Sequence, residues 1–196
     1  MKKYAILSVL ACAVFAACGG GESADAPASG GAASAPAAPA APTMPTGEMM
    51  MPDWFQMDAD AQTVTMTLTA GTVSDNNYWN FNGATKGGMA ITVPEGYAVT
   101  IEFVNSDPVM AHSLGISAET TTFGAMPEPI AVFEGAMSAN PGSMMESTMP
   151  GQSETIQFVA DAAGNYSIVC YIAGHAVTGM WIYFNVSADG TAGVQQ

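Results

Sequence analysis

Basic residues are almost missing from this chain of 196 residues, which has three lysines, no arginine and 17 acidic residues. Lys86 is the only base after Cys18, whereas all of the acidic residues lie after that position. A chain this acidic is poorly suited to contacting phosphate backbones, so we expect no nucleic-acid partner. The charge favours solubility and is compatible with a basic protein partner.

The sequence also lacks a long hydrophobic run. The apolar stretch Tyr4–Ala17 is shorter than the roughly 20 residues of a membrane-spanning helix. It follows two lysines and ends in small residues before a cysteine, a layout typical of a secretory signal, here residues 1–17. The ending Phe15-Ala16-Ala17-Cys18 is similar to a bacterial lipobox, which predicts lipidation of Cys18. We therefore expect an exported, membrane-anchored lipoprotein in the periplasm or at the cell surface, with ordinary secretion as the alternative.

Large apolar side chains are rare in residues 18–50, which consist mainly of alanine, proline, glycine and serine. Such a segment cannot bury enough surface to fold, and we interpret it as a flexible tether. The remainder, residues 51–196, has the size of one ordinary domain and contains no internal repeat. We expect a monomer that is held at the membrane by its tether.

Helical periodicity is absent from the region expected to fold. Six segments instead alternate apolar and polar residues, as half-buried strands do: 62–70, 89–93, 97–104, 153–159, 165–170 and 181–186. Turn residues separate them, and the pattern predicts an all-β sandwich or barrel. Residues 117–151 are rich in proline, glycine and methionine, and we expect a long excursion there with one strand near 130–133.

Histidine and cysteine are scarce as well. The expected domain contains only His112, His175 and Cys170 of these two residue types. A lone cysteine in an exported protein has no disulfide partner, so we expect Cys170 to be functional. Two histidines are too few for the additional copper site of a copper oxidase or for a His-rich catalytic zinc site, and we expect no enzyme.

The C-terminal part contains the pattern C-x4-H-x4-M, formed by Cys170, His175 and Met180. Residues five apart diverge on a helix and face opposite sides of a strand, so regular structure would separate these three side chains. A loop can bring them to one point, and Gly174 and Gly179 supply the permissive backbone that a tight loop needs. We therefore predict a loop between two strands that gathers the three side chains.

His112 follows another predicted strand and can complete the cluster. Two imidazoles, one thiolate and one thioether are the ligands of a blue-copper electron-transfer site, in which the methionine is a weak axial ligand. Taken singly, each residue has a simpler reading, since a lone histidine or methionine usually belongs to the surface or the core. A Cys–His nucleophilic pair is a further alternative, which Met180 and the β-rich context disfavour.

Four segments resemble the cupredoxins, the type 1 blue-copper proteins, and among them sulfocyanin. They are YWNFNG (78–83), MAITVPEGYAVTIEFVN (89–105), AHSLGI (111–116) and CYIAGHAVTGMW (170–181). The resemblance implies a Greek-key β-sandwich that binds one copper ion through His112, Cys170, His175 and Met180. Ser113 stands where such proteins often have asparagine, a residue expected to tie the two ligand loops together.

The resemblance and the predicted anchor together imply a carrier of single electrons. Its partners would be membrane-associated respiratory redox proteins such as a cytochrome or a terminal oxidase. We expect His175 to be the ligand nearest solvent, and Trp181 and Phe184 to be strand and core residues.

Two other functions stay open. The methionine-rich runs at 49–51 and 144–149 could hold Cu(I) through their thioethers, which would suit a copper storage or delivery lipoprotein. A structural lipoprotein without a metal is the other possibility.

Overall fold

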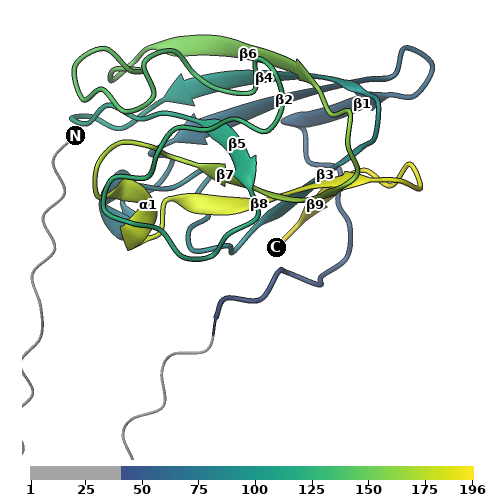
Figure 1. The fold of residues 1–196 in the computed structure, drawn as a ribbon, viewed down its shortest axis with the longest axis horizontal. Helices are drawn as coiled ribbons and strands as arrows, with labels where there is room; N and C mark the ends of the chain where they lie inside the picture. The colour runs from purple at the N-terminus through teal and green to yellow at the C-terminus, as the bar shows by residue number, and fades with distance from the viewer. Residues whose placement is uncertain (1–40) are drawn as a thin grey trace, which may run out of the picture. The chain divides into compact units, whose positions relative to one another are not determined.

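A computed structural model describes residues 41–196 of the chain, and these residues form two β-sheets that face each other (Figure 1). The predicted signal peptide, Cys18 and most of the predicted tether lie outside the described residues. Within residues 41–196 no helix is long and apolar enough to cross a membrane.

The first sheet has four strands in the order β1-β2-β4-β6. Their bounds are β1 Phe55–Asp58, β2 Thr63–Ala70, β4 Ala98–Asn105 and β6 Ser153–Val159. β2 and β4 run parallel, and the other two pairs are antiparallel. On β4 the residues Val99, Ile101 and Phe103 are buried and alternate with more exposed ones, as expected for a sheet with one face on the core.

The second sheet has five strands in the order β5-β7-β8-β3-β9. Their bounds are β3 Ala90–Pro94, β5 Gly115–Ala118, β7 Gly164–Val169, β8 Trp181–Ser187 and β9 Gly193–Gln195. β3 and β8 are parallel neighbours, and all five residues of β3 are buried. Trp181 and Phe184 lie on β8 and are buried, which confirms that they are strand and core residues.

From β2 to β7 the chain alternates between the two sheets, so each of these strands belongs to the opposite sheet from the strand that follows it. Consecutive strands therefore face each other across the core. This is a Greek-key sandwich, and the all-β prediction is confirmed. The apolar faces of both sheets form one core that reaches Cys170 and Met180 at one end.

The long segment after β5 contains no strand near residues 130–133, although one was predicted there from the sequence. That prediction is wrong, because these residues lie in irregular structure. Val132 donates one backbone hydrogen bond to the Ile116 carbonyl at 2.9 Å, and the ladder does not continue into a strand. Three short strands, β1, β5 and β9, were not predicted, since three or four residues carry too little alternation to be recognised.

The described end of the predicted tether contacts the domain. Met50 exchanges two backbone hydrogen bonds with Val194 of β9, at 2.9 and 2.8 Å. The Tyr183 hydroxyl donates to the Pro42 carbonyl at 2.9 Å, farther along the same sheet. The backbone from residue 42 to residue 50 therefore lies along the sheet that contains β8 and β9.

Candidate metal centre

Two loops at one end of the sandwich carry the predicted ligands. The first joins β7 to β8 and contains α1, a single turn over His175–Thr178 (Figure 1). Gly174 and Gly179 flank this turn with φ of 87° and 119°, a backbone conformation that glycine adopts without steric penalty. Met180 closes the loop: its carbonyl accepts from Cys170 N at 3.2 Å, and its N–H donates to the His175 carbonyl at 2.9 Å.

The second loop joins β4 to β5 and is fixed by buried polar groups. Asn105 is fully buried, and its amide donates to the carbonyls of Met110 and Thr148, both at 2.8 Å. His112 exchanges backbone hydrogen bonds with Thr148 at 3.0 and 3.2 Å. The backbone on both sides of His112 is thus held by the protein itself.

Three predicted ligand atoms converge between these loops. The His175 Nδ1 atom lies 3.2 Å from His112 Nδ1 and 3.5 Å from Cys170 Sγ, and the remaining side of the triangle, from Sγ to His112 Nδ1, is 3.9 Å. All three side chains are fully buried. The structure therefore brings His112, Cys170 and His175 together, although His112 is distant from the other two in the sequence.

The triangle has the dimensions of a metal site. The point equidistant from its three atoms lies about 2.1 Å from each, close to the roughly 2.0–2.3 Å at which imidazole nitrogen and thiolate sulfur bind zinc. Met180 is fully buried beside it, in the same core cluster as Cys170. A His₂Cys triangle with a neighbouring thioether fits copper in either oxidation state.

The outer nitrogen of His112 is paired with a carboxylate that the sequence reading missed. His112 Nε2 lies 2.9 Å from Asp107 Oδ2, and both side chains are buried. Burial lowers the pKa of His112, and the Asp107 carboxylate opposes that effect. The carboxylate accepts a hydrogen bond from Nε2–H, so the proton stays on Nε2 and Nδ1 is free to bind a metal.

Asp107 is kept ionised by its own hydrogen bonds. Burial raises the pKa of its carboxyl, but the N–H groups of Met110 and Val109, together with His112, outweigh burial and hold the pKa below its usual value. The Oδ1 atom accepts from Val109 N and Met110 N at 2.8 and 2.9 Å. One oxygen therefore fixes the loop while the other orients the imidazole.

Burial also sets the charge state of the other two ligands. It raises the pKa of the Cys170 thiol to about 11, against weaker opposing hydrogen bonds from the Ser113 and Ile172 backbone. Burial lowers the pKa of His175 to about 3, assisted by the neighbouring His112. The metal-free protein thus holds a neutral imidazole and a protonated thiol at neutral pH, and a metal must displace the thiol proton to bind there.

Ser113 joins the two ligand loops, in the place where asparagine was expected. Its hydroxyl accepts from Tyr171 N at 2.8 Å and lies 3.7 Å from Cys170 Sγ. Its backbone N–H donates to the same sulfur at 3.5 Å. Serine therefore connects the two ligand loops, as asparagine was expected to do.

All four predicted ligands are fully buried, so the expectation that His175 is the one nearest solvent stays a prediction. The side chain of His175 is fully buried, because the indole of Trp79 stacks on the imidazole with ring centroids 3.9 Å apart and an interplanar angle of 17°. Trp79 belongs to the YWNFNG segment, but nothing in the sequence indicated which ring it would cover. Long-range contacts of this kind have no local signal.

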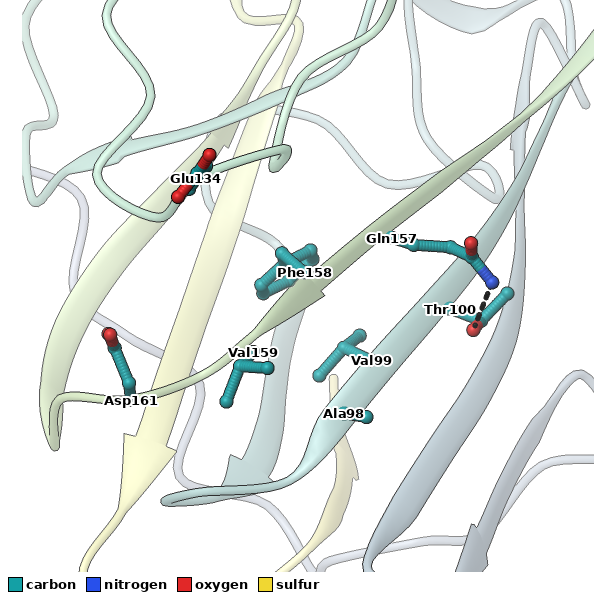
Figure 2. A pocket seen from close by; sticks show the side chains of 8 residues that line it. All are labelled: Ala98, Val99, Thr100, Glu134, Gln157, Phe158, Val159 and Asp161. Atoms are coloured by element: carbon teal, nitrogen blue, oxygen red, sulfur yellow. Dashed lines mark hydrogen bonds between the residues drawn. The ribbon is translucent and has the colours of Figure 1, made fainter.

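A surface hollow elsewhere on the sandwich does not have the residues of a metal site. It lies along β4 and β6 (Figure 2), where Gln157 Nε2 donates to Thr100 Oγ1 at 3.4 Å. Its lining side chains include no histidine, cysteine or methionine. The grouped metal-binding side chains lie instead in the loops described above.

Comparisons with known proteins show which proteins the chain is similar to. The sulfocyanin (SoxE) domain family matches residues 52–195. The sulfocyanin of Sulfolobus acidocaldarius is 31% identical over 136 residues, which are 67% of each chain. Among solved structures, the copper protein rusticyanin is similar at 25% identity with a TM-score of 0.47, covering 69% of this chain and 88% of its own. Auracyanin of Roseiflexus castenholzii is 24% identical with a TM-score of 0.42, covering 63% and 96%.

Proposed function

The chain belongs to the sulfocyanin family, and from that premise we propose that it is a mononuclear blue-copper protein that carries single electrons. The observation that supports this most directly is the buried triangle of His112 Nδ1, His175 Nδ1 and Cys170 Sγ. These three residues would hold the ion, and Met180 would supply a weaker thioether ligand. The bound copper would alternate between Cu(I) and Cu(II).

The protein's own residues would keep this site rigid during the cycle. The Asp107 carboxylate orients His112, Trp79 stacks on His175, and Ser113 contacts Cys170. Each of these contacts is made to a different predicted ligand. A site that changes little between two oxidation states requires little rearrangement when an electron is transferred.

The proposed setting is a membrane surface. Residues 1–17 would be removed as a signal peptide, Cys18 would carry the lipid, and residues 18–50 would connect it to the copper domain in residues 51–196. A domain on such a tether could meet a donor and an acceptor in turn, and a respiratory cytochrome or terminal oxidase would suit this role. The support comes from the composition of the N-terminal sequence.

Copper storage or delivery is the second candidate, and exposed thioethers favour it. Met126 is 80% exposed, Met145 79% and Met144 52%. Thioether sulfur is a soft ligand that suits Cu(I). A storage or delivery protein would bind copper at these methionines and give it up readily.

Copper titration of the purified protein separates these functions. We expect one equivalent of Cu(II) to produce an intense blue colour that ascorbate bleaches and ferricyanide restores. Cys170→Ser should abolish the colour, because the thiolate is its source, whereas a double variant with Met144→Leu and Met145→Leu should keep it. Strong blue colour in Cys170→Ser would refute the assignment, and loss of bound copper only in the methionine variant would favour storage or delivery.

A further inference from the structure

Trp79 occupies the position between His175 and the surface. The two rings are stacked nearly parallel, at 17°, with centroids 3.9 Å apart. His175 is fully buried, whereas Trp79 is half-buried, so part of this residue reaches solvent although its Nε1 atom is buried. The indole thus extends the flat aromatic surface of a ligand ring outwards to the exterior of the protein.

An unusual backbone segment places the indole there. Asn76, Asn77 and Tyr78 have φ of 52°, 59° and 64°, so three consecutive residues adopt the left-handed conformation. Asparagine tolerates this region, but an aromatic residue rarely enters it, and a run of three is disfavoured. Strained backbone of this kind persists only where the surroundings impose it, and it gathers at functional sites.

The surroundings here are the side chains of two asparagines. Asn80 is fully buried; its amide donates to the Val73 carbonyl at 2.8 Å, and its oxygen accepts from Thr72 N and Gly83 N, both at 3.2 Å. Asn76 donates to the Trp79 carbonyl at 2.8 Å. The turn is therefore clamped from both sides, and Trp79 is held in one position.

The other predicted ligands have no comparable access to the exterior. His112 has its outer nitrogen on Asp107, which is 2% exposed. Met180 is fully buried, and Cys170 is followed by Tyr171, which is 3% exposed. Among the aromatic contacts of the described residues, the stack on His175 is the one that leads from a ligand to a solvent-accessible ring.

On the basis of the proposed function, we propose that Trp79 is the electronic coupling residue through which electrons pass between His175 and a redox partner. The step moves one electron and no proton. The reduced copper site loses the electron and the partner gains it, while neither ring changes its covalent bonds. A partner would therefore dock over the turn that contains Trp79 rather than over an exposed ligand imidazole.

The test measures how fast the reduced protein is oxidised by tris(phenanthroline)cobalt(III), whose cobalt(III) becomes cobalt(II). We expect Trp79→Leu to slow this reaction by about tenfold or more, because the reacting groups lose contact. Trp79→Phe retains a stacked ring and should stay within about threefold of the unmodified protein. The reduction potential and the visible absorption should change little, which separates lost coupling from a damaged site.

Trp54→Leu is the matched control. Trp54 is also a half-buried indole, but its ring lies edge-on to Phe55 at 6.4 Å and stacks on no predicted ligand. Its variant should react at the unmodified rate. Equal or faster oxidation of Trp79→Leu would overturn the inference and leave the proposed function intact, whereas an unmodified protein that stays colourless with copper would remove the proposed function itself.

A second measurement needs no substitution. Tris(phenanthroline)chromium(III) is paramagnetic and takes no electron from the reduced protein, so it broadens the NMR signals of the residues against which it docks. We expect the ring protons of Trp79 to broaden before the methyl groups of Val177, which is 51% exposed on α1. Broadening at Val177 without any at Trp79 would contradict the inference.

Discussion

The hydrogen bond between Asp107 and His112 decides which imidazole nitrogen can bind a metal. The carboxylate, 2.9 Å away, accepts a hydrogen bond from Nε2–H, which keeps the proton on Nε2 and leaves Nδ1 without one. Asp107→Asn would keep the turn, since an amide oxygen can still accept from Val109 N and Met110 N. The amide nitrogen would then face Nε2 as a donor and favour the tautomer with a proton on Nδ1.

Asp107→Asn should therefore weaken copper binding by about 10- to 100-fold, as is usual when a carboxylate behind a metal-binding histidine is lost. Competition against a chelator of known affinity measures this change. Asp75→Asn removes the same charge from an exposed position in the Trp79 loop and should leave the affinity unchanged. An equal loss in both variants would mean that the effect is long-range charge rather than orientation.

The lowered pKa of His175 predicts how the stability of the metal-free protein changes in acid. This pKa is about 3 in the folded protein because of burial, against 6.5 as the ordinary value. Between these values the unfolded chain binds a proton that the folded chain excludes, so stability falls as the pH decreases. His175 by itself should contribute a slope that approaches about 1.4 kcal/mol per pH unit.

Urea unfolding of the metal-free protein between pH 7 and pH 4 checks this expectation. His175→Leu removes the titrating group and should flatten the profile. An unchanged profile in that variant would show that other groups control the acid response.

At the scale of elements, the important junction lies where β2 ends. Gly71 has a φ of 75°, and a Cβ atom there would lie 2.6 Å from Asp107 N, a backbone atom. Its N–H also donates to the Asn80 carbonyl at 3.2 Å. The loop that carries Trp79 and the loop that carries Asp107 thus meet at one glycine.

Gly71→Ala should lower the free energy of unfolding by about 3 kcal/mol, from backbone strain and the close contact together. It should also weaken copper binding, because Asp107 has to move. Gly96→Ala is matched in φ, at 83°, but has no heavy atom within 4 Å of the added Cβ. That variant should cost about 1 kcal/mol and leave copper affinity unchanged. Chemical unfolding and copper competition on both variants test the contrast.

The strands and the ligand residues could be predicted because their signals are local. Alternation marked the six longer strands, and the spacing of Cys170, His175 and Met180 indicated a loop that converges on one point. The tautomer set by Asp107 and the cover provided by Trp79 could not be predicted. Both depend on how separate loops pack, and the left-handed turn before Trp79 is held by the side chains of Asn76 and Asn80.

At the scale of the whole molecule, charge is distributed unevenly along the sandwich. The turns at the end away from the ligand loops carry exposed acids: Asp58, Asp60, Glu95, Asp161 and Asp189. The ligand loop from Cys170 to Met180 contains no acidic residue and no lysine. Lys86 lies against this loop at Gly179, so a partner that approaches the loop would meet this base and no acid from the loop itself.

The residues before the first strand also contribute to the stability of the whole domain. A fragment of residues 51–196 lacks the hydrogen bond that the Pro42 carbonyl accepts from Tyr183 and the pair between Met50 and Val194, whereas a fragment of residues 41–196 keeps them. We expect the shorter fragment to lose about 2 kcal/mol and about 6 °C in Tm. Calorimetry of both metal-free fragments measures the difference, and equal Tm values would mean that these contacts contribute nothing.

The central claim is that two imidazoles, one thiolate and one thioether from two loops surround a single copper ion. X-ray absorption at the copper edge of the loaded protein tests it most directly. The account predicts a short shell of two nitrogens and one sulfur, and the sulfur should disappear from that shell in Cys170→Ser. A shell made only of thioether sulfur, or one that is the same with and without the Cys170 thiol, would contradict it.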